Sequence, residues 1–172
     1  MPKLFLIRHG EPALKGVLLG RLNPGLSPGG LAAAEAIVSR QSAAVAYVSP
    51  LNRAQQTASY LPSAIPRVTL DDLAEVSLGE WEGQSWADVE RQHPEAARQK
   101  LERWFDIPAP GGESWDEVRA RASKAFRRIL EGPRPVIVVA HQGINSALHS
   151  LLTGEDPHLF SQAYCQVYEY EL

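Results

Sequence analysis

The sequence predicts an α/β protein with three layers, in which a mainly parallel central sheet with one antiparallel edge strand lies between two layers of helices. Short apolar runs flanked by Gly and Pro alternate along the chain with segments of helical periodicity. The strongest run, from Val136 to Ala140, is apolar at every position, as expected of a strand buried on both faces. A length of 172 residues suits a single domain, residues 1–172, with its own core.

Five segments are predicted to be strands on this pattern. They are residues 3–8, 44–49, 67–70 and 135–140, and an edge strand within residues 164–171. Cys165 is the only cysteine, so the chain cannot form an intramolecular disulfide or a cysteine metal cluster. We expect Cys165 to be a small apolar filler in the last strand.

Two helices are predicted in the first half of the chain. Ser27 followed by Pro28 is typical of an N-cap with proline at the first helical position, and the alanine-rich segment after it predicts a helix through Val38. Residues 50–60 form the next helical pattern, which ends before Pro62.

Two further helices are predicted in the second half. Ser114 with Glu117 three residues later forms a capping box, which predicts the start of a long amphipathic helix closed by Gly132. Residues 145–152 form another helical pattern, which ends at Gly154.

Residues 84–110 differ from the alternating pattern around them. They contain two short helical patterns separated by Pro94, with Trp86, Trp104 and Phe105 as apolar anchors. We interpret this segment as a helical insertion that lies over the active site at the working edge of the sheet. No internal repeat or linker indicates a second domain.

The composition excludes some classes of partner. The 17 basic and 20 acidic residues give a formal net charge of −3, without the basic excess of a nucleic-acid-binding protein. The apolar runs are too short to cross a bilayer, and the first residues lead into a strand instead of a signal-peptide core. We therefore expect a cytoplasmic protein that binds neither nucleic acid nor membrane.

Two histidines follow two of the predicted strands. Arg8 and His9 come at the end of the first strand, and His141 and Gln142 follow the fourth. Ligands of open parallel sheets bind beyond the carboxyl ends of the strands, where residues distant in sequence meet. The sequence thus predicts a pocket with two histidines and arginine, which suits phosphate chemistry.

Five strings of residues, in this order along nearly the whole chain, resemble the motifs of the histidine phosphatase superfamily, also called phosphoglycerate-mutase-like. Each string alone is a weak signal, but all five in the same order are specific. The strings are Arg8, His9, Gly10, Glu11; then Gly20, Asn23, Leu26, Ser27, Gly30; then Ser49, Leu51, Arg53, Ala54, Thr57, Ala58; then Leu73, Glu75, Gly79, Trp81, Glu82, Gly83; and finally Gly111, Gly112, Glu113, Ser114 with His141 and Gly143.

The resemblance implies a catalytic role for five of these residues. His9 would be the nucleophile, since a neutral imidazole attacks phosphate at neutral pH and splits one difficult hydrolysis into two transfers. Arg8, Arg53 and His141 would hold the transferred phosphoryl group, whose charge is spread over three oxygens. Glu75 would protonate the leaving group and later deprotonate water, and we expect surrounding aromatic groups and phosphate to favour its protonated form.

Other residues are candidates for secondary roles. We expect the substrate to be contacted by Gly20, Asn23, Glu113, Ser114 and Gln142. Three other carboxylates near the pocket, Glu11, Glu80 and Glu82, are alternatives to Glu75. Residues with a structural interpretation are His93, His149 and His158, expected on the surface or on helix faces, and Trp81, Trp86, Trp104 and Trp115, expected in the core or in lid packing.

The chain also departs from the family pattern. Residues 12–15 lack the asparagine that often follows the nucleophile motif, and the loop there is about two residues short. Asn23 stands where the family usually has aspartate, Gln142 where glycine is common, and Asn145 where arginine is frequent. These changes affect the walls that select the substrate more than the phosphate cradle.

The resemblance implies a metal-independent phosphatase that hydrolyses a small phosphate monoester through a phosphohistidine on His9. Within the family, the chain most resembles the short members, including α-ribazole-5′-phosphate phosphatases and broad-specificity phosphatases. No cofactor or metal is expected, because the sequence has no metal-binding motif or nucleotide loop. The alternatives are a phosphoglycerate mutase, a phosphohistidine phosphatase and a non-catalytic phosphate-binding regulatory module. Val167, Tyr168 and Tyr170 make the last strand a candidate contact in a homodimer.

Overall fold

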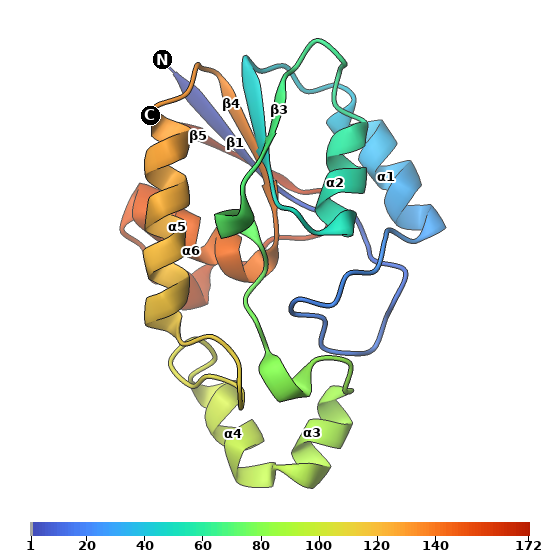
Figure 1. Cartoon of the computed structure of the whole chain (residues 1–172), viewed down its shortest axis with the longest axis vertical. Coiled ribbons are helices and arrows are strands. Elements are labelled where there is room, and N and C mark those ends of the chain that lie inside the picture. Colours follow the sequence, from blue (N-terminus) through green and yellow to red (C-terminus); the bar gives the residue numbers. More distant parts are fainter. Residues whose placement is uncertain (1) are drawn as a thin grey trace.

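A five-stranded sheet forms the centre of the computed structural model, which describes residues 2–172 (Figure 1). Its strands lie in the order β3-β2-β4-β1-β5, and all neighbours are parallel except β1 and β5. The predicted α/β class with one antiparallel edge strand is confirmed. The strands are β1 (Lys3–Arg8), β2 (Val45–Val48), β3 (Arg67–Thr69), β4 (Val136–Ala140) and β5 (Val167–Glu171).

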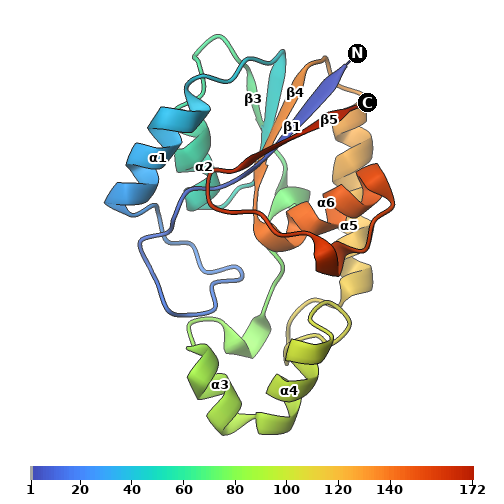
Figure 2. The ribbon, with the colours of Figure 1, turned by 180° about the vertical axis from the view of Figure 1, so that it is seen from behind.

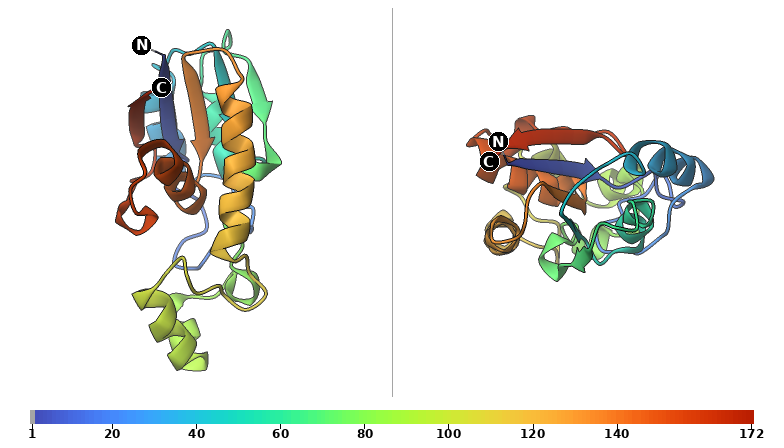
Figure 3. Two further views of the ribbon diagram at one scale, coloured as in Figure 1. Left: turned by 90° about the vertical axis from the view of Figure 1, so that its left-hand side faces the viewer. Right: turned by 90° about the horizontal axis from the view of Figure 1, so that it is seen from above.

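Helices cover both faces of the sheet (Figures 1 and 3). Alternate residues of a strand point to opposite faces, so Ile7 and Val139 pack with helices α1 and α2, whereas Leu6 and Val138 pack with α5 and α6. The four helices are α1 (Pro28–Val38), α2 (Asn52–Ser59), α5 (Trp115–Leu130) and α6 (Gln142–Thr153). The near-complete burial of β4 explains its continuous apolar sequence.

The helix ends agree with the predicted caps at three points. Ser27 Oγ accepts from Gly30 N, Ser114 and Glu117 form the capping box, and Gly154 ends α6 with a φ of 77°. Helix α6 starts three residues earlier than the predicted 145–152, because the extended main chain of His141 is its N-cap and no side-chain cap marks that start in the sequence. Among residues 2–172, no helix is both long and apolar enough to cross a bilayer.

Cys165 does not lie in the last strand, contrary to the prediction. It is fully buried in the turn before β5, with a φ of 58°, and its N–H donates to the carbonyl of Arg8. The turn delays the strand until Val167, because Gln166 N bonds back to Ala163 O. Cys165 still fills an apolar space, in a buried cluster with Leu26 of the loop before α1 and Ala34 of α1.

The predicted insertion contains two short helices, α3 (Trp86–Gln92) and α4 (Pro94–Glu102), which lie beyond the carboxyl end of the sheet (Figures 1 and 2). They have a small core of their own around Trp81 and Val89. Three 3-10 helices complete the described elements: η1 (Asp71–Leu73), η2 (Gly79–Trp81) and η3 (Pro157–Leu159).

Lys100 fixes the turn that follows α4. Its side chain is buried, and Nζ donates to the carbonyls of Trp104 and Ile107, the latter at 2.6 Å. Burial lowers the pKa of Lys100 from 10.5 to about 8. In the unfolded chain the amine keeps its ordinary pKa, so between about pH 8 and 10.5 the unfolded state binds more protons and the free energy of unfolding rises with pH.

We expect this effect to appear as a difference between the native chain and Lys100→Met. From pH 7 to pH 10 the free energy of unfolding of the native chain should rise by roughly 2 kcal/mol relative to the variant. Urea unfolding of both proteins across this range measures the change. Curves that stay parallel would show that the ammonium ion is not disfavoured in the folded chain.

Candidate active site

The two predicted histidines lie next to each other at the carboxyl end of the sheet. Strands β1 and β4 pair in parallel with Arg8 opposite Ala140, so the residue after each strand reaches the same point. The ring centroids of His9 and His141 are 4.9 Å apart. The register of the two strands therefore brings His9 and His141 together although they lie far apart in the sequence.

The hydrogen bonds of His9 define its tautomer. Nδ1 lies 2.7 Å from the carbonyl of Gly10, which can only accept, so Nδ1 carries the proton. Arg53 Nε donates to His9 Nε2 at 3.3 Å, so Nε2 presents its lone pair. The Gly10 amide donates in turn to Thr57 Oγ1, which fixes the main chain beside the ring. His9 thus has the form of a nucleophile with Nε2 as the attacking atom.

Burial keeps both rings neutral. Desolvation, with Arg53 and Arg8 nearby, lowers the pKa of His9 to about 3. Desolvation, followed by the neighbouring His9 and the arginines, lowers the pKa of His141 well below its usual value. Nitrogen NMR of the phosphate-free protein should therefore show both imidazole rings in the neutral form between pH 5 and 8. The single ring proton of His9 should be on Nδ1. The spectrum of His9→Gln assigns the signals. A His9 midpoint near pH 6.5 would contradict this expectation.

Arg53 is held rigidly at the start of α2. It is 1% exposed, and its terminal nitrogens donate to the carbonyls of Leu22 and Gly20 at 2.7 and 2.9 Å. Desolvation is the main cause that lowers the pKa of Arg53, and the charge of Glu75 opposes it. The loop around Gly20 thereby orients the guanidinium toward His9.

Arg8 approaches the same place from the end of β1. Its NH1 donates to the carbonyl of Gln162 at 2.7 Å, and its guanidinium lies 4.2 Å from the ring centroid of Tyr164. Burial lowers the pKa of Arg8, whereas Tyr164 and Glu75 raise it. Its Nε is buried and has no hydrogen-bond partner among the described residues. Two arginines thus flank one nucleophilic nitrogen.

Glu75 lies at the N-terminus of α6. Its carboxylate accepts hydrogen bonds from the amides of Val76, Gly143 and Ile144, at 2.8, 3.2 and 3.2 Å. Two of these amides are free N–H groups of the first turn of α6, so the contacts fix the orientation of the Glu75 carboxyl group. Glu75 also lines the same cavity as His9.

The alternative carboxylates are placed elsewhere. Glu11 bonds to Ser27 Oγ and pairs with Lys15, while Glu82 accepts from the amides of two loop residues. Neither they nor Glu80 line the cavity. The structure thus selects Glu75 as the carboxylate that faces the candidate nucleophile.

A cavity of about 430 Å³ opens beside His9, within the size range of small-molecule sites. Six of the residues expected at the site line it, namely Arg8, His9, Gly20, Arg53, Glu75 and Gln142. Gln142 is tied back by its amide, which donates to the carbonyl of Phe160 and accepts from Gln162 N.

His141 lies behind the cavity wall. It is fully buried, and its Nε2 is 2.7 Å from Ser49 Oγ, which also accepts from Leu51 N. A hydroxyl has one proton and two acceptor lone pairs, so Ser49 Oγ can donate to His141 Nε2 or accept from it, and the proton of the neutral ring is then on Nδ1 or Nε2 respectively. That Nδ1 is buried without a partner among residues 2–172.

Three residues expected to contact substrate do not reach the cavity. Asn23 Oδ1 accepts from Asn52 N at 2.6 Å, so its side chain joins the loop to α2. Ser114 caps α5, and Glu113 pairs with Arg121 and accepts from the Ser77 amide. Their side chains are occupied by local contacts, which the order of residues in a motif does not reveal.

Sequence reasoning missed Arg121 and the cavity wall contributed by residues 157–164. Arg121 donates to the carbonyls of Asp72, Ala74 and Glu75, and so fixes the main chain that carries the Glu75 carboxylate. The sequence signal that could have indicated Arg121 is its position next to the buried face of the long helix α5. The wall residues lie in an irregular segment, for which periodicity gives no signal.

Within residues 2–172, no group of three or more His, Cys, Asp or Glu side chains has the arrangement of a metal site. The side chains that surround His9 are instead the two guanidinium groups of Arg8 and Arg53 and the carboxylate of Glu75. Such a set can bind an anion, attack it and exchange a proton with it.

Curated proteins with similar sequences include a bifunctional mycobacterial protein and a mutase. A bifunctional protein of Mycobacterium tuberculosis is 38% identical over 152 residues, which are 81% of this chain and 41% of that protein. The chain thus spans less than half the length of that relative. A 2,3-bisphosphoglycerate-dependent phosphoglycerate mutase of Brucella canis is 30% identical over 173 residues, covering 90% of this chain and 82% of the mutase.

Solved structures show the same architecture. A mycobacterial glucosyl-3-phosphoglycerate phosphatase superimposes with a TM-score of 0.86 at 25% identity, over 98% of this chain and 89% of that one. The α-ribazole phosphatase of Shigella flexneri has a TM-score of 0.80 at 26% identity, over 91% and 82%. These relatives support an enzyme of the phosphatase or mutase type. Residues 4–172 match the sequence profile of branch 1 of the histidine phosphatase superfamily, and the chain belongs to that family.

Proposed function

We propose that this protein is a metal-independent phosphatase that hydrolyses a small phosphate monoester through a phosphohistidine on His9. One observation carries the proposal: the unprotonated Nε2 of His9 is adjacent to Arg53 and opens on a cavity lined by a second arginine. A neutral imidazole in that position needs no further activation to attack phosphorus.

In the first step, His9 Nε2 forms a bond to phosphorus and the bond from phosphorus to the ester oxygen breaks. The leaving alkoxide takes a proton from the carboxylic acid form of Glu75. In the second step, water attacks the phosphohistidine, the nitrogen–phosphorus bond breaks, and the Glu75 carboxylate accepts the proton from water. Inorganic phosphate leaves, and both residues return to their starting forms.

Preorganised cations stabilise the phosphoryl group in both transfers. Arg53 already donates to the attacking nitrogen, so a phosphoryl group bonded there lies within reach of its Nε. Arg8 has a buried Nε without a protein partner among the described residues, and His141 has a buried Nδ1 without one. We assign these groups as further donors to the phosphoryl oxygens.

A phosphoglycerate mutase is the second candidate, supported by the similarity to the Brucella enzyme. A mutase must hold the substrate's second acidic group while phosphate returns. Among the described residues that line the cavity, the only Lys or Arg side chains are Arg8 and Arg53, which both flank His9. The cavity therefore has no second cationic cradle, and this favours release of the dephosphorylated alcohol.

The test is a panel of phosphate esters assayed with chelator, together with mass spectrometry of rapidly quenched protein. We expect release of inorganic phosphate in the presence of chelator and a phosphate group on His9. Phosphorylation of His9 by a bisphosphoglycerate donor, with transfer to phosphoglycerate and no net hydrolysis, would favour the mutase. An absence of both turnover and label would leave a phosphate-binding module.

A further inference from the structure

We propose that the site selects phosphomonoesters whose alcohol carries an uncharged planar ring, and that Trp104 and Phe105 of the insertion bind that ring. The inference rests on the proposed phosphatase function and adds the class of alcohol. The cavity provides four observations that support it.

The cavity is polar around His9 and mostly apolar along the rest of its wall, where His158 and Gln142 are the polar side chains. His9, Arg8, Arg53 and Glu75 surround the phosphate position. The loop after the nucleophile motif, which lacks the asparagine frequent in the family, contributes apolar side chains instead. The apolar and aromatic lining consists of Val17, Leu18, Leu19, Val76, Leu78, Trp104, Phe105, Phe160 and Tyr164.

The rings of the insertion are fixed from behind. The centroid of Trp104 is 5.8 Å from that of Trp86, and the centroid of Phe105 is 4.2 Å from that of Trp115. Lys100 holds the turn that carries both rings, because its Nζ donates to the carbonyl of Trp104. Each ring therefore needs little reordering when a ligand binds, and preorganised aromatic surfaces bind planar rings most effectively.

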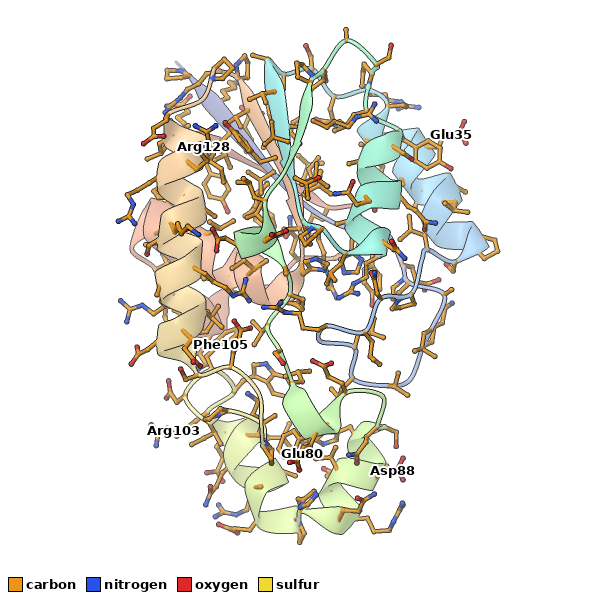
Figure 4. All side chains as sticks on the ribbon, viewed as in Figure 1. Glu35, Glu80, Asp88, Arg103, Phe105 and Arg128 are labelled. Atoms are coloured by element: carbon orange, nitrogen blue, oxygen red, sulfur yellow. The ribbon has the colours of Figure 1, made fainter. Side chains whose placement is uncertain are left out.

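Phe105 also connects the insertion to the segment between α6 and β5, which crosses the lower end of the sheet in Figure 2. Its ring is 4.9 Å from that of His158, and its amide donates to His158 Nε2 at 3.5 Å. Figure 4 places Phe105 where the insertion meets the end of α5. Two segments distant in sequence thus close the wall opposite the phosphate position.

The charges argue against an acidic alcohol. Two further arginines, Arg21 and Arg121, pair with Glu113 and donate to the Glu75 carbonyl, and neither lines the cavity. The imidazole at the aromatic end, that of His158, is paired with Asp156, so a carboxylate or second phosphate there would be desolvated near another carboxylate and without a Lys or Arg side chain in the lining. A neutral ring has a much smaller desolvation cost than a charged group, and it gains contact with the aromatic faces.

The test compares substrates with the same leaving group. Ribose 5-phosphate and the 5′-monophosphates of inosine and adenosine all release a primary 5′-hydroxyl and differ in the planar base. We expect kcat/KM to be at least about fivefold higher for the nucleotides, which corresponds to the lower end of the range for a base stacked on an aromatic side chain. The ratio of nucleotide to ribose 5-phosphate is the readout, which cancels changes common to both.

Phe105→Leu and Trp104→Leu keep an apolar side chain but remove the planar ring. Each should lower the ratio toward one, mainly through KM for the nucleotide. Leu101→Ala is the matched control, because Leu101 is 58% exposed on α4 and does not line the cavity, and it should keep the native ratio. Circular dichroism confirms that each variant is folded, and the two leucine variants test the idea independently.

The outcomes separate the two proposals. Equal kcat/KM for all three esters, or a native ratio in both leucine variants, would overturn the ring preference while the phosphatase function stands. Hydrolysis of none of the esters in any panel would overturn the function itself.

Discussion

His9→Ala should abolish phosphate ester hydrolysis, with a loss in kcat on the order of 10⁵- to 10⁶-fold, as for removal of other covalent nucleophiles. Neither neighbouring imidazole is placed to replace it. His141 is fully buried with its Nε2 bonded to Ser49. His158, which also lines the cavity, lies against Phe105 and is paired with Asp156. The remaining arginines would still bind phosphate but would have nothing to transfer it to. Steady-state assays and quenched-protein mass spectrometry measure both effects.

The buried position of His9 calls for controls on folding. His9→Gln retains a polar side chain of similar length and should be equally inactive while binding inorganic phosphate. His93→Ala removes an exposed histidine between α3 and α4 and should keep native activity. Turnover by His9→Ala, or a phosphate label on it, would refute the assigned nucleophile.

The parts of the fold that sequence predicted are those with local signals. The run from Val136 to Ala140 is typical of a strand buried on both faces, and the parallel pairing of such strands brings the next residues to one edge. Once two strands end in His9 and His141, a shared pocket follows from topology. That is why the centre of the site could be predicted without coordinates.

The walls of the pocket could not be predicted in this way. Motif order suggested Asn23, Glu113 and Ser114 as substrate contacts, but it carries no information on where a side chain points. Phe105 and Tyr164 reach the cavity through turns whose position depends on tertiary packing, not on periodicity. The candidate catalytic residues of this chain thus have local sequence signals, whereas the shape of the alcohol site depends on tertiary packing.

Arg53→Ala should lower kcat by about 10²- to 10³-fold, the usual effect of losing one preorganised donor in a transition state. The Arg53 side chain contacts the attacking nitrogen and is itself held in place. Its Nε donates to His9 Nε2, and its terminal nitrogens donate to the carbonyls of Gly20 and Leu22. Arg53→Lys should recover little of this loss, because an ammonium group cannot replace the planar fork that bonds in three directions.

The same contacts create a structural effect that must be separated from the catalytic one. Arg67→Ala is the matched control, because Arg67 also donates to a main-chain carbonyl, that of Leu61, but lies in β3 outside the cavity. If the deficit of Arg53→Ala came only from a loosened loop, it would appear in KM and in thermal stability. A loss confined to those quantities, with native kcat at saturating substrate, would remove Arg53 from the transition state. A loss in kcat at unchanged unfolding temperature, in Arg53→Lys as well, would place its guanidinium on the phosphoryl group in flight.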